Sequence, residues 1–280
     1  MEKKEILYTI KGLPPFPETA LKAIKAIKDP DSSAQDLVDI IQYDQSITAN
    51  ILRFANSAYF GLRTRVTSLK QAVAYLGSKA IMDMLLLSGS LSYFRGEHTG
   101  YGLKGEDLLN HSVSTALMCR ILGQKTGLKD TSTLFTAGLL HDIGKVVLSS
   151  FVKDKYDEIV QLVTNKNYSF VRAEKEVLGM DHAQVGGEIA QQWGFPEEIG
   201  RPISLHHQFE EAPLEDISTP LVFLADQVYF LVGGTMGADS WSFKKIKDAL
   251  KRCRLKEYDL DDAMLMLHEP LKSFQDLIRS

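Results

Sequence analysis

The segment Leu221–Val232 has the length and apolar composition of a buried helix, yet it carries an acidic residue, Asp226. On a helix, the neighbours of Asp226 one turn away in each direction are all apolar or aromatic: Val222, Phe223, Tyr229 and Phe230. A carboxylate in this setting is buried or nearly so, and an unpaired buried charge strongly destabilises a fold. We therefore expect the chain to bring a cation, a hydrogen-bond network or a metal ion to Asp226.

Apolar residues recur with a helical period along most of the chain, and the sequence shows no sustained strand-like alternation. Prolines, glycines and capping residues separate the apolar runs, as at Asp29-Pro30-Asp31 and at Gly77. These patterns predict an all-α fold. Helices are expected from Glu18 to Asp29, twice within 33–56, and over 67–77, 79–94, 106–123, 131–141, 144–163, 169–179, 182–193, 196–207, 217–232, 243–252 and 260–278.

A charged and glycine-rich segment, Arg95–Gly105, is the clearest internal boundary. With this boundary, we expect an N-terminal helical subdomain over 13–100 and a second helical subdomain over 101–235. A polar lead-in over residues 1–12 precedes them, and a helical extension over 236–280 follows them. The extension has a basic run followed by aspartates. A solvated helical face, docking onto the preceding subdomain and a homodimer contact are all compatible with that pattern.

The composition argues against several function classes. Of the 280 residues, 44% are hydrophobic and 24% charged, as is usual for globular proteins, and the net charge of −4 gives no basic field to attract nucleic acid or a membrane. Two cysteines, Cys119 and Cys253, make no disulfide framework, and the N-terminal residues contain no signal-peptide core. Because the apolar runs are also too short to cross a bilayer, we expect a cytoplasmic protein with no membrane partner.

Residues 33–56 read as helix, turn and helix, which superficially resembles a DNA-binding helix-turn-helix. Over residues 31–60, however, four aspartates face a single cation, Arg53. Phosphate contacts dominate the affinity for nucleic acid and need positive charge. We therefore predict no nucleic-acid binding.

Histidines and aspartates gather at the ends and on the apolar faces of the expected helices. They are His111, the pair His141-Asp142, His182, the pair His206-His207 and Asp226. Small residues at Ala137-Gly138 and at Gly186-Gly187 predict open space beside the imidazoles of His141 and His182. His141 and Asp142 would diverge by about 100° on a regular helix and converge only where the helix ends, which the following Gly144 favours. Taken singly, each histidine also fits an ordinary role as a surface or core residue or a helix-end cation.

Together, five imidazoles and two carboxylates can hold one or two first-row divalent ions, such as Fe, Mn, Ni or Zn. The predicted ligands are His111, His141, Asp142, His182, His206, His207 and Asp226, and either member of the His206-His207 pair can be the one that ligates. In this hypothesis Asp142 bridges two ions, which can activate water and stabilise charge on a phosphate ester. Lys145 could contact the phosphate, and an exposed lysine is the alternative.

The order His111, His141-Asp142, Asp226 is similar to the H…HD…D pattern of the HD superfamily of metal-dependent phosphohydrolases. Three further segments, Leu13–Ala20, Asn56–Gly61 and Thr67–Gly77, resemble the signature segments of the HDOD family, the HD-related output domains of bacteria. The resemblance covers about residues 10–230. It implies an all-helical fold and a role in bacterial signalling, with protein partners. Many HDOD members have lost the metal ligands, whereas this chain keeps them.

His182 and His206-His207 look like the additional ligands of the HD-GYP branch, whose members hydrolyse cyclic di-GMP. The residues that follow, Gln208–Glu215, contain no Gly-Tyr-Pro segment, so the substrate contacts of that branch do not carry over. Two functions follow from the resemblance. One is a regulatory output module that retains a two-metal site, and the other is an active phosphohydrolase or phosphodiesterase acting on a nucleotide or cyclic dinucleotide. In the second, Asp142 and Lys145 are the expected catalytic residues.

Overall fold

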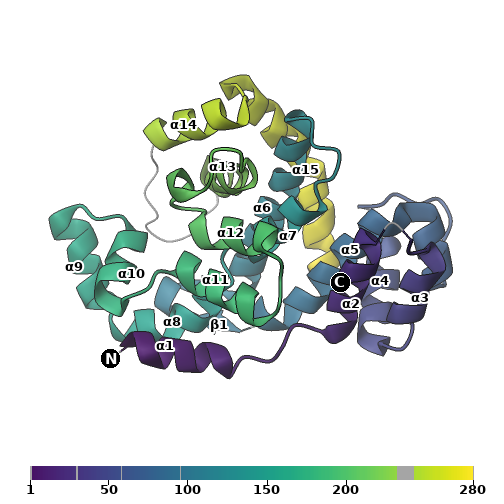
Figure 1. Cartoon of the computed structure of the whole chain (residues 1–280), viewed down its shortest axis with the longest axis horizontal. Helices are drawn as coiled ribbons and strands as arrows, with labels where there is room; N and C mark the ends of the chain where they lie inside the picture. Colours follow the sequence, from purple (N-terminus) through teal and green to yellow (C-terminus); the bar gives the residue numbers. More distant parts are fainter. Residues whose placement is uncertain (1, 30, 58, 95, 232–242, 280) are drawn as a thin grey trace. The chain divides into compact units, whose positions relative to one another are not determined.

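The structure is a computed structural model that describes residues 2–29, 31–57, 59–94, 96–231 and 243–279. Within these ranges most residues are helical and the strands are confined to one short hairpin (Figure 1), which confirms the predicted all-α class. The chain forms two compact units. The smaller unit comprises Pro15–Ser92 with His268–Ser280, and the larger unit comprises Met1–Pro14 with Tyr93–Leu267.

The smaller unit contains α2 (Glu18–Lys28), α3 (Ala34–Ile41), α4 (Gln45–Ala55) and most of α5 (Leu69–Phe94). Ser33 and Asp44 cap α3 and α4, since their side chains accept hydrogen bonds from the first-turn backbone. Gly77 breaks α5 with a φ of 80°, a conformation that costs glycine little. The helix end predicted at Gly77 is therefore present.

The larger unit contains the other helices. They are α1 (Glu2–Lys11), α6 (Gly105–Lys125), α7 (Ser132–Leu140), α8 (Gly144–Asp154), α9 (Tyr156–Lys166), α10 (Phe170–Leu178), α11 (His182–Gln192), α12 (Glu197–Leu205), α13 (Ser218–Leu231), α14 (Phe243–Cys253) and the first part of α15 (Glu257–Arg279). The single helix predicted over 144–163 is instead two, because Lys155 has non-helical dihedral angles (φ −114°, ψ 14°) between α8 and α9.

Two segments of the larger unit have more structure than predicted. Within the segment expected as a polar lead-in, Glu2–Lys11 form α1, because Ile6 and Ile10 lie one turn apart and are both buried where α1 contacts α8 and α11. The segment expected as a boundary loop forms a small hairpin, although no strand was predicted. Its elements are β1 (Glu97–His98), the 3₁₀ helix η1 (Thr99–Tyr101) and β2 (Leu103–Lys104).

The middle of the larger unit is a bundle around the end of α7. Helix α13 contacts α6, α7 and α12, while α11 contacts α8 and α12 (Figure 1). The turn from α7 to α8, residues 141–143, is buried in this bundle. A polar sequence at that turn therefore faces side chains from several helices at once.

The sequence predicts open space beside the His141 and His182 rings at the neighbouring small residues. That prediction is wrong. A side chain at Gly138 would meet Cys119 Sγ at 2.7 Å, and one at Gly187 would meet Ser204 Cβ at 2.6 Å. The space is filled by α6 and α12, because these helices pack closely on α7 and α11 at the glycines.

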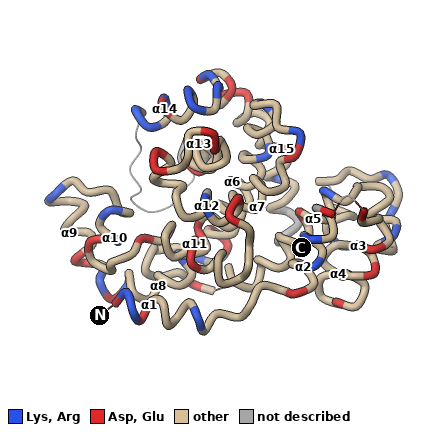
Figure 2. Tube along the Cα trace, in the orientation of Figure 1, with Lys and Arg blue, Asp and Glu red and all other residues tan. Residues whose placement is uncertain are grey.

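The basic run of the extension lies on α14 (Figure 2). Lys245 Nζ donates a hydrogen bond to the carbonyl of His207 at 2.9 Å, and Arg252 donates to the carbonyls of Phe209 and Asp216 at 2.8 and 3.0 Å. Of the alternatives left open for the extension, docking on the preceding helices is therefore observed. The predicted boundary at residues 235–236 lies outside the described residues, and a homodimer contact stays a prediction.

Two segments are long and apolar enough to cross a membrane by composition, Leu69–Phe94 and Ser132–Asp154. The first is broken at Gly77. The second consists of α7, a turn and α8, and 83% of its most apolar window is buried inside the protein. Because buried core helices meet the same criterion, composition alone does not make either segment a membrane span.

We expect Gly144→Ala to lower the free energy of unfolding by about 1–3 kcal/mol, the usual cost of overpacking. The added Cβ would overlap the backbone carbonyl of His182, where α8 begins against α11. Gly200→Ala in α12 is the control, since its Cβ would meet only Ala190 Cβ, at 3.9 Å. Thermal unfolding followed by circular dichroism measures both variants. Equal stability of the two would contradict the close packing of α8 on α11.

Candidate metal centre

The His141-Asp142 pair lies where α7 ends and α8 has not yet begun. Helix α7 stops at Leu140, and α8 starts at Gly144. His141 and Asp142 can therefore point into the same interior region, and their exposed fractions are 0% and 1%. The predicted convergence at a helix end is present, and the absence of a side chain at Gly144 lets α8 approach α11 there.

The structure brings every histidine and aspartate singled out from the sequence into one buried region. His111 comes from the middle of α6, His182 is the first residue of α11, His206 and His207 follow α12, and Asp226 lies on α13. All are buried except His207, which is half-buried. The donor atoms fall into three overlapping groups, each spanning less than 4.8 Å: His111, His141, Asp226; His141, Asp142, His206; and His182, His206, His207.

We call His111, His141, Asp142 and Asp226 the first donor cluster. His111 Nε2 lies 3.1 Å from His141 Nε2, 3.1 Å from Asp226 Oδ1 and 3.4 Å from Asp142 Oδ2. His141 Nε2 lies 3.5 Å from both Asp226 Oδ1 and Asp142 Oδ2. Four donor atoms from three separate parts of the chain thus face a common point.

We call Asp142, His182, His206 and His207 the second donor cluster. It uses the other oxygen of Asp142: Oδ1 lies 3.3 Å from His182 Nε2 and 3.9 Å from His206 Nε2. His182 Nε2 lies 2.9 Å from His207 Nε2. Asp142 therefore presents Oδ2 to the first cluster and Oδ1 to the second.

The spacing of these atoms fits ligands of a common ion. Two nitrogen or oxygen ligands at about 2.1 Å from one ion lie about 3.0–3.4 Å apart for right-angle to tetrahedral coordination. Most of the donor distances above, 2.9–3.5 Å, match this separation. Without a shared cation or proton, lone pairs this close repel one another.

Hydrogen bonds on the far side of three imidazoles fix which nitrogen faces the interior. His141 Nδ1 donates to the carbonyl of Gly138, and His206 Nδ1 donates to the carbonyl of Ile203, each at 2.8 Å. His182 Nδ1 donates to Glu174 Oε2, also at 2.8 Å. Because each Nδ1 makes this outer hydrogen bond, Nε2 is the nitrogen of each ring that faces the donor clusters. Metal-binding histidines are usually held in this way.

His206 tests whether these residues fit a metal ion. Its Nε2 is enclosed and has no hydrogen-bond partner among the described residues, and the same holds for Asp142 Oδ1. These two acceptors face each other at 3.9 Å. A buried acceptor without a partner destabilises the fold, and a cation shared by the two atoms removes that cost. The donor set therefore fits a divalent ion.

Both carboxylates of the clusters are held in the ionised form. Burial acts to raise the pKa of Asp142 and of Asp226, but neighbouring groups outweigh it, so both pKa values lie well below the ordinary value. The main opposing group for Asp142 is Lys145, whose Nζ lies 2.9 Å from Oδ2 and whose side chain is 4% exposed. For Asp226 the opposing groups are His111 and His141. Lys145 is therefore not the exposed lysine that the sequence allowed as an alternative. Its ammonium group is buried against Asp142.

The imidazoles of the second cluster divide by charge. Burial lowers the pKa of His182, but Glu174 and Asp142 outweigh burial and raise that pKa to about 9. Burial, reinforced by His141 and His182, lowers the pKa of His206 to about 3. The position between Glu174 and Asp142 thus stabilises positive charge, while His206 is a neutral donor. Both properties suit a site for a cation.

Sequence reasoning missed Glu174 and Tyr101. Glu174 is fully buried on α10 and accepts hydrogen bonds from His182 and from Tyr101. A signal for Glu174 exists: it lies one turn from Phe170 and one turn from Leu178, on the apolar face of the helix. Tyr101 lies in the glycine-rich hairpin and has no comparable signal.

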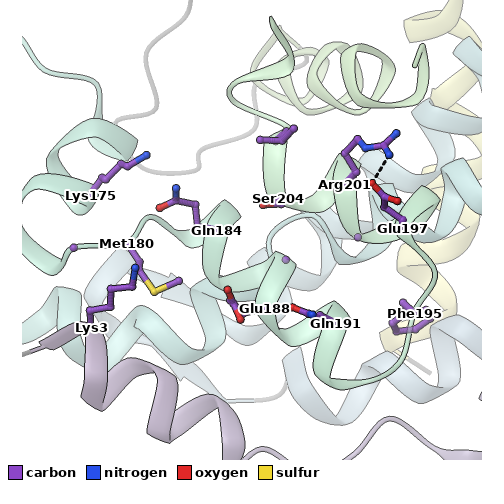
Figure 3. Close-up of a pocket in the computed structure, with 14 residues that line it drawn as sticks. Lys3, Lys175, Met180, Gln184, Glu188, Gln191, Phe195, Glu197, Arg201 and Ser204 are labelled. Carbon is purple, nitrogen blue, oxygen red and sulfur yellow. Dashed lines mark hydrogen bonds and ion pairs between the residues drawn. The ribbon is translucent and has the colours of Figure 1, made fainter. Parts of the chain in front are cut away.

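A separate groove of about 700 Å³ lies on the outer faces of α11 and α12 (Figure 3). Its lining includes Gln184 and Glu188 of α11 and Arg201 and Ser204 of α12, and Arg201 pairs with Glu197 there. The lining residues that the structure describes include none of the predicted ligands. The groove is therefore separate from the donor atoms of His182, His206 and His207, which lie at the ends of the same two helices.

The HDOD domain model matches residues 13–209, about 70% of the chain. The chain belongs to the HDOD family. Its fold matches an HDOD domain protein of unknown function from Geobacter sulfurreducens, with a TM-score of 0.77, 24% identity and coverage of 97% of this chain and 95% of that one. It also matches a candidate metal-dependent phosphohydrolase from Shewanella amazonensis, with a TM-score of 0.64, 18% identity and coverage of 98% and 99%.

Curated relatives of this HDOD chain are longer proteins. An uncharacterized protein of Treponema pallidum is 26% identical over 231 residues, which cover 81% of this chain and 44% of the relative. Ribonuclease Y of Desulfotalea psychrophila is 30% identical over 158 residues, which cover 56% of this chain and 23% of that protein. The HDOD chain thus spans less than half the length of either relative.

Replacing Lys145 by methionine is expected to lower the free energy of unfolding by about 3–5 kcal/mol in the presence of a chelator, because it leaves the buried Asp142 without its ammonium partner. Lys22→Met is the matched control: it removes an exposed helical ion pair with Glu18, and little change is expected. Chemical denaturation measures both. If the two variants were equally stable, Lys145 would not be the cation that compensates Asp142.

Proposed function

We propose that this chain is a cytoplasmic regulatory module of bacterial signalling that holds two divalent ions of the Fe, Mn, Ni or Zn type. The observation that carries the proposal is the position of Asp142, whose two oxygens face two different sets of donors. We assign the first donor cluster to one ion and the second donor cluster to the other. Membership of the HDOD family supports the regulatory role.

The burial of the clusters favours regulation over turnover. Six of the seven proposed ligands are buried, and only His207 is half-buried. The ligands of such buried ions are brought together only in the native state, so ion binding contributes to the stability of the fold. His182 begins α11, His206 and His207 directly follow α12, and these two helices also line the groove of Figure 3. We infer that ion loading sets the spacing of these two helices and is read by a protein partner at that surface.

The purified chain is expected to contain two divalent ions, and Asp226→Asn is expected to retain one, since Asp226 belongs only to the first cluster. Elemental analysis by mass spectrometry gives the stoichiometry. Asp157→Asn, at an exposed position of α9, is the control and should keep both ions. A chelator should lower the melting temperature of the wild type, because ions that bind only the native state stabilise it. Purified protein that holds no metal and takes none up on titration would rule out the proposal.

A second candidate function is the hydrolysis of a phosphate ester. It is favoured by the relative named Ribonuclease Y and by the complete set of HD ligands. Two bound ions would supply Lewis acidity to water and to the phosphate group. Within the chain, Lys145 would keep Asp142 ionised, since its Nζ already contacts that carboxylate, and we place Lys145 there rather than on the phosphate.

Hydrolysis is tested with bis(p-nitrophenyl) phosphate, nucleotides, cyclic di-GMP and an RNA oligonucleotide on metal-loaded protein. The regulatory proposal predicts the same low rate for the wild type and for Asp226→Asn. A wild-type rate at least tenfold above that of Asp226→Asn, with Asp157→Asn unaffected, would instead establish the second function.

A further inference from the structure

A buried carboxylate outside both clusters contacts His182. Glu174 Oε2 accepts hydrogen bonds from His182 Nδ1 at 2.8 Å and from the His182 backbone N–H at 3.1 Å. Its other oxygen, Oε1, accepts a hydrogen bond from the hydroxyl of Tyr101 at 2.5 Å. Both Glu174 and His182 are 0% exposed, and Tyr101 is 8% exposed. Both carboxylate oxygens therefore have partners, and neither of those partners is solvent.

We propose that Glu174 and Tyr101 are the positioning residues of the second donor cluster. Glu174 orients the His182 ring so that Nε2 faces Asp142 Oδ1 and His207, and Tyr101 holds Glu174 in that position. This inference rests on the proposed two-ion site. It gives Glu174 on α10 and Tyr101 in the β1–β2 hairpin a role in metal affinity, although neither residue is one of the seven proposed ligands.

The need for Glu174 follows from the charge of the two clusters. The first cluster has two carboxylates, Asp142 and Asp226, while the second has three imidazoles and only the shared Asp142. A carboxylate hydrogen-bonded to the outer nitrogen of an imidazole makes the inner nitrogen a stronger donor to a cation. Glu174 thus supplies negative charge to the second cluster through the His182 ring.

The other imidazoles with a defined outer partner show that Glu174 is specific to this position. His141 and His206 both donate from Nδ1 to a backbone carbonyl, of Gly138 and Ile203. A carbonyl fixes the orientation of a ring but carries no net charge. Among these three rings, His182 alone is held by a carboxylate, so the effect of Glu174 should be confined to the second cluster.

Tyr101 lies in the β1–β2 hairpin, with its ring near both His182 and Lys145. Its ring lies with its centroid 6.4 Å from that of His182, edge to face, and Lys145 Nζ lies 5.7 Å from the Tyr101 centroid. Phe170, one turn before Glu174 on α10, packs against the same ring at 5.9 Å. The hydroxyl is therefore held where it can donate to Glu174, and its removal leaves the rest of the packing in place.

The test is a Zn²⁺ titration of chelator-treated protein by calorimetry, with elemental analysis of the loaded forms. Glu174→Gln, which keeps the shape of the side chain, is expected to weaken one of the two sites by about 10- to 100-fold, the usual effect of losing such a partner. The other site should keep its wild-type affinity. Tyr101→Phe should weaken the same site by a smaller factor. The matched controls are Glu176→Gln, exposed on the same helix, and Tyr156→Phe, half-exposed on α9.

The outcomes separate this inference from the proposed function. Two sites of wild-type affinity in both Glu174→Gln and Tyr101→Phe would overturn the positioning role and leave the two-ion site standing. Equal weakening of both sites would also overturn it, because it would indicate a general loss of packing. If the wild type bound no Zn²⁺ at all, the proposed function would fail and this inference with it.

Discussion

The structure of the larger unit depends on one buried carboxylate that faces two directions. Asp142 Oδ2 is directed at His111, His141 and Lys145, while Oδ1 is directed at His182 and His206. This is possible because α7 ends before Asp142, and because Gly144 lets α8 start against the backbone of α11. A charge this deeply buried constrains every element around it, since each must bring a cation, a donor or a ligand.

The balance of charge explains how the fold tolerates such a centre. Asp142, Asp226 and Glu174 are buried carboxylates, and Lys145 is the buried ammonium among them. Three imidazoles are held from their outer nitrogens: His141 and His206 donate to backbone carbonyls, and His182 donates to Glu174. Such a donor set suits a divalent cation. Holding ions and turning over a phosphate ester are nevertheless different properties, and the enclosure of the ligands favours the first.

Much of this centre could be predicted from sequence, because its residues violate local rules. Asp226 breaks an apolar helix, and His141-Asp142 stands at a helix end marked by Gly144. Glu174 breaks the rule in the same way, on the apolar face of α10, but a nine-residue helix with other charges hides it. Tyr101 could not be predicted, since its role depends on the hairpin bringing it to α10. The close helix packing at Gly138 and Gly187 could not be predicted from the sequence either. A small residue can leave space for a side-chain ring or for a neighbouring helix, and the sequence does not distinguish the two.

Anomalous X-ray diffraction from crystals of the metal-loaded protein would locate the bound ions relative to the two oxygens of Asp142. Two peaks are expected on opposite sides of the Asp142 carboxylate, about 3.5–4 Å apart, the separation that is usual in two-metal sites. One peak should lie among His111, His141 and Asp226, and the other among His182, His206 and His207. A single peak that leaves one oxygen of Asp142 uncoordinated, or peaks only at surface residues, would show that Asp142 is not shared by two ions.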